Sequence, residues 1–275
     1  MPELPEVETV VRDLRPLIVG RTIRSVEVGA AALRSPWLPE WGRALTGRKV
    51  KSLGRRGKWI LISLSRGGTL LVHLGMTGQL TVRRATEALA DHTHLRFGIG
   101  GRPREELRFR DVRRFGSATY FPSSEELTSF LDARLGPEPF GLDAEYWLTA
   151  LGRTKRAIKA ALLDQQLVAG VGNIYADESL FAARIHPATI AADLDDRQAD
   201  RLREAIARVM TDAIEKRGSS IRDYIGGSGL GGGYQDEFAV YGRTGEPCPN
   251  CGHPIDLMRI SGRSTHFCRE CQPEA

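Results

Sequence analysis

The chain lacks long apolar runs. Although 41% of its 275 residues are hydrophobic, no apolar stretch reaches the ~18 residues that a membrane-spanning helix needs. It also begins without a charged segment leading into an apolar one, so we expect no secretory signal peptide. We therefore expect a soluble, cytoplasmic protein with no membrane partner, rather than a membrane-embedded or secreted one.

Cysteine is scarce, and its placement is specific. The four cysteines form two Cys-x-x-Cys pairs, Cys248 with Cys251 and, after sixteen further residues, Cys268 with Cys271. This spacing is typical of a structural zinc ribbon with four cysteine ligands, and a cytoplasmic location disfavours disulfides. Four protein ligands leave no open position on the metal, so the pattern predicts one structural Zn²⁺. The zinc would stiffen a hairpin with residues 261–264 at its tip.

Acidic side chains are missing from residues 43–66, where the sequence has eight lysines and arginines. The whole chain carries a formal net charge of +5 at pH 7. Clustered Lys and Arg attract phosphates, so this segment favours a polyanionic partner.

The pattern of apolar residues changes along the chain. Between residues 22 and 121, short apolar segments alternate with turns, which indicates a β-sandwich or a flattened barrel. After Pro137 and Pro139 the period becomes helical, and residues 136–141 are the expected interdomain linker. The length alone is compatible with one large domain or two. The clearest strands are expected at 59–64, 69–74, 95–99, 107–110 and 118–121, and the clearest helical face at Leu202, Ala205, Ile206, Val209, Met210, Ala213 and Ile214.

The start of the chain has the pattern of an amphipathic helix. Apolar residues recur three and four positions apart over residues 7–18, and Pro5 suits the first turn. Removal of Met1, which a small second residue favours, would leave Pro2 as a secondary amine beside the carboxylate of Glu3. An α-amino group has a pKa of about 7.7–8.0, so it is partly nucleophilic at neutral pH and gives an iminium ion with a sugar carbon. The plain alternative is that these residues only begin a helix.

Three turns carry side chains that suit nucleic acid. Residues 73–78 would hold Met76 out on a tight turn, and residues 111–116 place two arginines beside an aromatic residue, which suits phosphate contact and base stacking. In residues 168–178 we expect Asn173 to cap the next helix, whose N-terminus could bind a phosphate. Each motif also has an ordinary structural explanation, such as a buried methionine or a solvated surface.

Residues 2–9, Pro-Glu-Leu-Pro-Glu-Val-Glu-Thr, resemble the amino terminus of bacterial formamidopyrimidine-DNA glycosylases. The resemblance continues through the motifs above to the last cysteine. It implies an α+β multidomain fold in three parts. Residues 1–135 would form a catalytic helix and a β-sandwich, residues 136–237 a helical domain with a helix–two-turn–helix element and a lesion-capping loop, and residues 238–275 a zinc finger.

The resemblance also implies roles for individual residues. Pro2 matches the nucleophile of the family and Glu3 its catalytic carboxylate. Lys58 and Arg263 match basic residues that position phosphates, and Lys155 adjoins Thr154, where the family often has a DNA-contacting lysine. The implied DNA contacts are Met76, His92, Arg113, Phe115, Lys155, Asn173 and Tyr241, of which Met76, Arg113 and Phe115 would fill the space left by a flipped nucleotide. The implied lesion contacts are Ser219, Ile221, Arg222 and Tyr224.

The function that the resemblance implies is that of a bifunctional DNA glycosylase and abasic-site lyase. Such an enzyme would excise oxidised purines from damaged double-stranded DNA as a monomer in base excision repair, without a redox cofactor or catalytic metal. Two alternatives remain at this point. An endonuclease VIII-type enzyme would prefer oxidised pyrimidines, and a non-catalytic zinc module would bind DNA without reacting with it.

Overall fold

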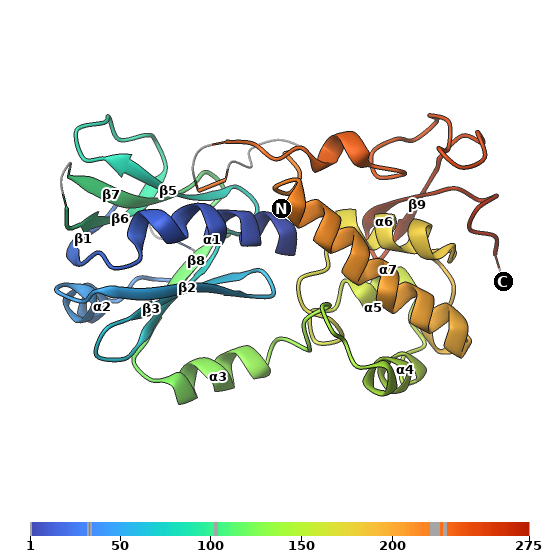
Figure 1. Ribbon diagram of the computed structural model, residues 1–275, viewed down its shortest axis with the longest axis horizontal. Coiled ribbons are helices and arrows are strands. Elements are labelled where there is room, and N and C mark those ends of the chain that lie inside the picture. The colour runs from blue at the N-terminus through green and yellow to red at the C-terminus, as the bar shows by residue number, and fades with distance from the viewer. Residues whose placement is uncertain are drawn as a thin grey trace. The chain divides into compact units, whose positions relative to one another are not determined.

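The computed structural model describes residues 2–31, 33, 35–101, 104–220, 226–227 and 230–274. The chain forms two compact units, one of residues 1–133 and 216–233 and the other of residues 134–215 and 234–275. Figure 1 shows the elements in chain order. Within the described ranges, no helix combines the length and the apolar character needed to cross a bilayer.

The first unit is built on two four-stranded antiparallel sheets. One has the strand order β1-β6-β7-β5 and the other β2-β3-β4-β8. Its strands are β1 (Ile23–Val28), β2 (Val50–Arg56), β3 (Trp59–Leu64), β4 (Thr69–His73), β5 (Gly78–Arg84), β6 (Thr93–Ile99), β7 (Glu105–Asp111) and β8 (Ser117–Phe121). Its helices are α1 (Leu4–Ile18), α2 (Pro39–Leu45) and α3 (Ser124–Asp132).

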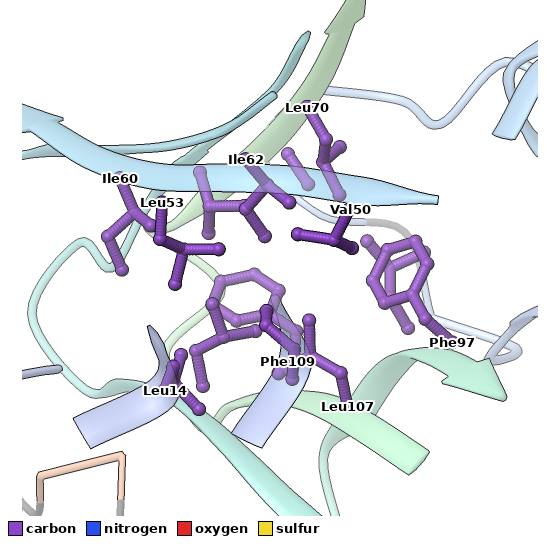
Figure 2. Close-up of a cluster of buried hydrophobic side chains, with 14 of the residues drawn as sticks. Leu14, Val50, Leu53, Ile60, Ile62, Leu70, Phe97, Leu107 and Phe109 are labelled. Carbon is purple, nitrogen blue, oxygen red and sulfur yellow. The ribbon is translucent and has the colours of Figure 1, made fainter. Parts of the chain in front are cut away.

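The core of this unit lies between the sheets. Apolar side chains from β2, β3 and β4 face those from β6 and β7, and Leu14 of α1 joins them (Figure 2). Helix α1 packs against the edge strands β2 and β5, so it covers an open edge between the two sheets. This arrangement confirms the predicted sandwich, and α1 contributes Val7, Val10, Val11, Leu14 and Ile18 to its core.

Local sequence did not reveal every element of the first unit. Helix α2 has seven residues and buries only Leu45, too little for a periodic apolar face. Strand β2 carries part of the basic segment 43–66, and Lys51 is exposed on it. Helix α1 passes through Pro16 and ends at Ile18, because a proline in the last turn removes few helical hydrogen bonds.

The second unit is helical and ends in a small hairpin. It comprises α4 (Ala144–Gly152), α5 (Ile158–Leu162), α6 (Asn173–Ala183), α7 (Asp196–Glu215), the 3-10 helices η1 (Ala191–Asp193) and η2 (Tyr234–Glu237), and the strands β9 (Asp256–Ile260) and β10 (Arg263–Phe267). All seven residues of the predicted helical face on α7 are buried. Helix α6 is buried along most of its length, and it packs against both α7 and β10.

Candidate functional site

The predicted nucleophile lies at the buried start of α1. Pro2 is buried, and Glu3 is the residue that precedes the first turn of the helix. The Glu3 amide donates to Glu6 Oε2 at 2.8 Å, and the Glu3 side chain accepts from the Glu6 amide, which completes a reciprocal capping box. Met1 lies outside the described residues. The capping box fixes the direction in which the chain enters α1, and with it the positions of Pro2 and Glu3.

Lys58 is held in the two-residue turn between β2 and β3. The residue is only 5% exposed, so it is not the solvated lysine that a strand start usually carries. Arg55 braces the turn, because its guanidinium donates to Gly57 O at 3.0 Å and to Glu8 Oε2 of α1 at 3.2 Å. The turn that carries Lys58 is thereby tied to the helix that begins beside Pro2.

A buried carboxylate joins the loops that carry the predicted base-contacting residues. Asp111 is fully buried. Its Oδ1 accepts from Thr77 Oγ1 at 2.5 Å and from the Arg113 amide at 3.3 Å, and its Oδ2 accepts from the Gly116 amide at 2.7 Å. Its own amide donates to His92 O at 3.0 Å. Asp111 therefore brings together the segments that carry Met76, His92, Arg113 and Phe115.

Asp111 holds the backbone of these loops, whereas several of their side chains are exposed. Met76 is 37% and Phe115 44% exposed, and the Arg113 guanidinium lies 4.8 Å from the centre of the Phe115 ring. Gly75 allows the loops to approach, since a Cβ there would be 2.4 Å from the Gly116 nitrogen. The first unit thus presents a group of apolar and cationic side chains on loops whose backbone is held by Asp111. His92, whose carbonyl accepts from the Asp111 amide, is also exposed.

Replacing Asp111 with alanine is expected to destabilise the first unit. The change leaves the Gly116 amide and the Thr77 hydroxyl without their acceptor, while the Arg113 amide keeps its bond to Thr77 Oγ1 at 3.0 Å. Losing hydrogen bonds to a buried charge costs about 3 kcal/mol. Urea unfolding should show this loss, whereas Asp91→Ala, at an exposed position nearby, should change the free energy of unfolding by less than about 0.5 kcal/mol. Equal stability of the two variants would mean that Asp111 does not organise the loops.

Of the predicted lesion contacts, Ser219 lies within the described residues, and it is hydrogen-bonded to α1. Its amide and hydroxyl donate to Glu6 Oε1 at 2.8 and 3.1 Å, and both residues are buried. Glu6 therefore has two functions, since its other oxygen accepts from Glu3. The remaining predicted lesion contacts, Ile221, Arg222 and Tyr224, lie outside the described residues.

In the second unit the expected role of Asn173 as a helix cap is wrong. Gly172 is the N-cap of α6, and Asn173 is the first helical residue. Its Nδ2 donates instead to Ser264 O at 3.0 Å, which connects the start of α6 to the β9–β10 hairpin. The residue next to Ser264, Arg263, is exposed and follows a two-residue turn in which Ser261 and Gly262 both have positive φ angles, as a tight hairpin turn requires.

A buried ion pair that the sequence did not reveal supports this connection. Lys159 Nζ lies 2.6 Å from Asp177 Oδ1, with both side chains fully buried, and donates to Ser264 O at 2.7 Å. Asp177 Oδ2 accepts from the amide of His266 at 3.0 Å. Lys159 follows Arg153, Lys155 and Arg156 in the sequence, yet its side chain is fully buried. The structure shows that it holds the hairpin strand that carries Arg263.

The two other predicted contacts in this unit differ in environment. Lys155 is exposed on the loop between α4 and α5. Tyr241 is partly buried, and its amide and those of Ala239 and Val240 donate to the carboxylate of Glu178. Burial raises the pKa of Glu178, and the three N–H donors oppose that shift. Glu178 thus fixes the backbone beside Tyr241.

The four cysteines meet as the spacing predicts. Their sulfur atoms all lie within 4.8 Å of one another, with 3.8 Å between Cys248 and Cys271 and 3.5 Å between Cys251 and Cys268. Tetrahedral Zn–S bonds of about 2.3 Å separate sulfurs by about 3.8 Å, so the cluster fits zinc. It is the site of one structural Zn²⁺.

Three protein-family models match the chain. The formamidopyrimidine-DNA glycosylase N-terminal domain matches residues 1–118, the formamidopyrimidine-DNA glycosylase H2TH domain matches residues 135–224, and the zinc finger found in FPG and IleRS matches residues 245–273. The formamidopyrimidine-DNA glycosylase of Desulforamulus reducens is 44% identical over 276 residues, with 99% of both chains covered. That of Bacillus subtilis is 43% identical over 279 residues, with the same coverage.

Solved structures agree with these sequence matches. A complex of Lactococcus lactis Fpg with DNA that contains an abasic site has a TM-score of 0.91 at 35% identity, and the match covers 99% of this chain and 100% of that chain. A complex of the same protein with DNA containing FAPY-dG has a TM-score of 0.90 at 35% identity, with equal coverage. The fold, the zinc site and these matches define a DNA glycosylase of damaged-DNA repair. The chain belongs to the formamidopyrimidine-DNA glycosylase family.

Proposed function

We propose that the protein is a bifunctional glycosylase and abasic-site lyase that excises oxidised purines, such as 8-oxoguanine and formamidopyrimidines, from damaged double-stranded DNA. The observation that carries this proposal is the buried Pro2–Glu3 start of α1. There, a processed amino terminus would place a secondary amine beside a carboxylate. Related Lactococcus lactis proteins were solved with DNA containing an abasic site or FAPY-dG.

The proposed reaction begins at the sugar. The Pro2 nitrogen attacks C1′, the bond from C1′ to the base breaks, and Glu3 transfers a proton that assists opening of the sugar ring. The resulting iminium ion is an electron sink that acidifies the hydrogen on C2′. Loss of that proton expels the 3′ phosphate by β-elimination, and δ-elimination then expels the 5′ phosphate. Lys58 and Arg263 position these phosphates.

The other site residues would bind the DNA. Chemistry on a base in duplex DNA requires the nucleotide to leave the stack, and the exposed Met76, Arg113 and Phe115 suit the vacated space. Backbone phosphates would be bound by His92, Lys155, Asn173 and Tyr241. The lesion would be read by residues 219–224, with Ile221, Arg222 and Tyr224 among the contacts. Main-chain N–H groups of this loop would bind O6 of the oxidised base, and a backbone carbonyl near Ser219 would accept the hydrogen that N7 carries only after oxidation.

This proposal assigns one role to each part of the chain. Residues 1–135 carry the chemistry, residues 136–237 the phosphate-binding helices and the lesion loop, and residues 238–275 the zinc finger. We propose that the protein acts as a monomer in the cytoplasm, where its zinc-binding thiolates stay reduced.

Borohydride trapping on damaged duplex DNA tests the proposed function. Borohydride reduces the iminium ion to a stable amine, so we expect a covalent protein–DNA adduct that peptide mapping places on Pro2. Failure to form an adduct, with DNA binding intact, would favour a non-catalytic DNA-binding module. Faster excision of thymine glycol than of 8-oxoguanine would instead favour an endonuclease VIII-type enzyme.

Arg113 is expected to read the base opposite the lesion. A guanidinium donates without accepting, so it can pair with N3 and O2 of cytosine, whereas adenine places its N6 donor beside N1. A bidentate base contact is worth roughly 1–3 kcal/mol, which is about a 5- to 150-fold preference for cytosine. Single-turnover excision should show that Arg113→Ala narrows the cytosine-to-adenine ratio and that the control Arg114→Ala does not. Equal slowing on both duplexes would leave Arg113 as a wedge or backbone contact.

A further inference from the structure

An ion pair outside the proposed reaction centre joins α1 to the chain that follows α7. Arg217 donates from Nη1 to Asp13 Oδ1 at 3.0 Å and from Nη2 to Asp13 Oδ2 at 2.8 Å. The Asp13 side chain is 9% exposed and that of Arg217 is 40% exposed. Two parallel hydrogen bonds fix the orientation of the two groups more tightly than a single contact does. The pair therefore defines where the main chain at residue 217 lies relative to α1.

The backbone at residues 217 and 218 has an unfavourable conformation, and the Asp13–Arg217 ion pair can offset its cost in free energy. Arg217 has a φ of 66° and Gly218 a φ of 74°, so two successive residues are left-handed. Glycine adopts this conformation readily, whereas a residue with a Cβ does so at a cost in free energy. The double turn brings the next residue, Ser219, onto Glu6. Arg217 thus occupies a strained conformation directly before the main chain that the proposed function uses.

Helix α1 offers two fixed points for the segment that follows α7. Glu6 and Asp13 are seven residues apart, so they lie on one face of α1 about 10 Å from each other. Gly227 lies against the same face, because a Cβ there would be 2.7 Å from Leu14 Cγ and 3.0 Å from Val10 O. The described parts of the segment therefore follow the surface of α1. Two carboxylates of the helix hold the chain there, Asp13 at Arg217 and Glu6 at Ser219.

The described residues between 216 and 233 also have hydrogen bonds within the segment itself. It is rich in glycine, which gives the chain large conformational freedom and little surface to pack. Its described internal hydrogen bonds include one from the Gly232 amide to Ser220 Oγ at 2.8 Å and one from the Gly233 amide to Lys216 O at 3.0 Å. Ser219 itself is held by α1, through its amide and hydroxyl bonds to Glu6 Oε1.

We propose that Asp13 and Arg217 form a positioning pair that sets the main chain of Ser219 for recognition of the damaged base. The inference rests on the proposed function, because it assumes that Ser219 reads the base. It assigns the pair to base excision and not to cleavage of an existing abasic site, since an abasic site has no base to recognise.

Two rates measured on the full-length enzyme separate these reactions. Asp13→Asn and Arg217→Gln should each slow single-turnover excision of 8-oxoguanine by about 5-fold, the effect of a partly exposed ion pair worth about 1 kcal/mol. Cleavage of a preformed abasic site should be unchanged. The double variant should excise no more slowly than either single variant, because both changes remove the same interaction. Arg12→Gln is the matched control, because it breaks an ion pair with Glu8 on the neighbouring position of α1.

Arg217→Gly distinguishes positioning from simple stabilisation of the fold. Glycine relieves the left-handed conformation, so we expect the thermal unfolding temperature to be no lower than in the original protein while excision slows as in Arg217→Gln. Excision at the original rate in Arg217→Gly or in Asp13→Asn, or equal slowing of excision and abasic-site cleavage, would overturn the proposal.

Hydrogen exchange provides a readout that does not depend on catalysis. The peptide that contains residues 216–220 should exchange faster in Asp13→Asn than in Arg12→Gln, and equal exchange would also overturn the proposal. A parent enzyme that neither excises bases nor cleaves abasic sites would count against the proposed function alone. The exchange rates would still show whether the pair positions Ser219.

Discussion

A protein that retains Met1, or that carries a tag on its amino terminus, will lose both base excision and strand cleavage. In either form the nitrogen of Pro2 is an amide, and an amide cannot form the iminium ion on which both reactions depend. Because the covalent step is removed, we expect both rates to fall by about 1000-fold or more. Single-turnover assays on 8-oxoguanine and abasic-site duplexes would measure the fall, with mass spectrometry to establish the state of the terminus.

Two controls isolate the amine in this experiment. The same tag placed at the carboxyl terminus should leave both rates intact. Pro2→Gly with a processed terminus keeps a primary amine, so it should retain part of the lyase activity and form a borohydride adduct. Full activity in a protein whose amino-terminal tag is shown to be intact would falsify the mechanism, whatever the behaviour of the controls.

Cys248→Ser is expected to abolish zinc binding and to weaken DNA binding by about 100-fold or more. A structural zinc site contributes about 10–16 kcal/mol of binding free energy that is also folding energy, so its loss should unfold the β9–β10 hairpin. Cys248 packs with Phe181 of α6 and with Ile255, and Ser264 on the hairpin accepts from Asn173. The damage should therefore reach the start of α6. Metal analysis and fluorescence anisotropy with an abasic-site duplex measure the two effects.

The β-sandwich should survive the loss of zinc, because its core lies between its own two sheets. Hydrogen exchange in β3 and β4 should therefore be the same in Cys248→Ser as in the parent protein. Asn250→Ala, between the first two ligands, is the matched control and should keep both zinc and DNA binding. Undiminished DNA binding by the zinc-free variant would show that the zinc finger does not contribute to holding the duplex.

Structural features that depend on short stretches of sequence could be predicted from the sequence alone. The Cys-x-x-Cys pairs identified the zinc site, and the spacing of apolar residues identified the sandwich strands and the buried face of α7. The contact of the Asn173 side chain was not predictable in this way. Its position after two glycines suggests a cap, but Ser264 O, 91 residues away in sequence, lies within hydrogen-bond reach of its side chain, and Gly172 takes the N-cap position.

The sequence by itself determined the zinc ligands, the amphipathic start of the chain and the order of strands followed by helices, because each depends on residues that are neighbours along the chain. The tertiary structure alone decided which charged groups are buried and paired. Asp111 became the common acceptor of two loops, Lys159 the buried partner of Asp177, and Arg217 the partner of Asp13, 204 residues earlier. The physical reason is that the effect of a charge depends on its burial and on the groups around it, and folding brings those groups together from distant parts of the chain.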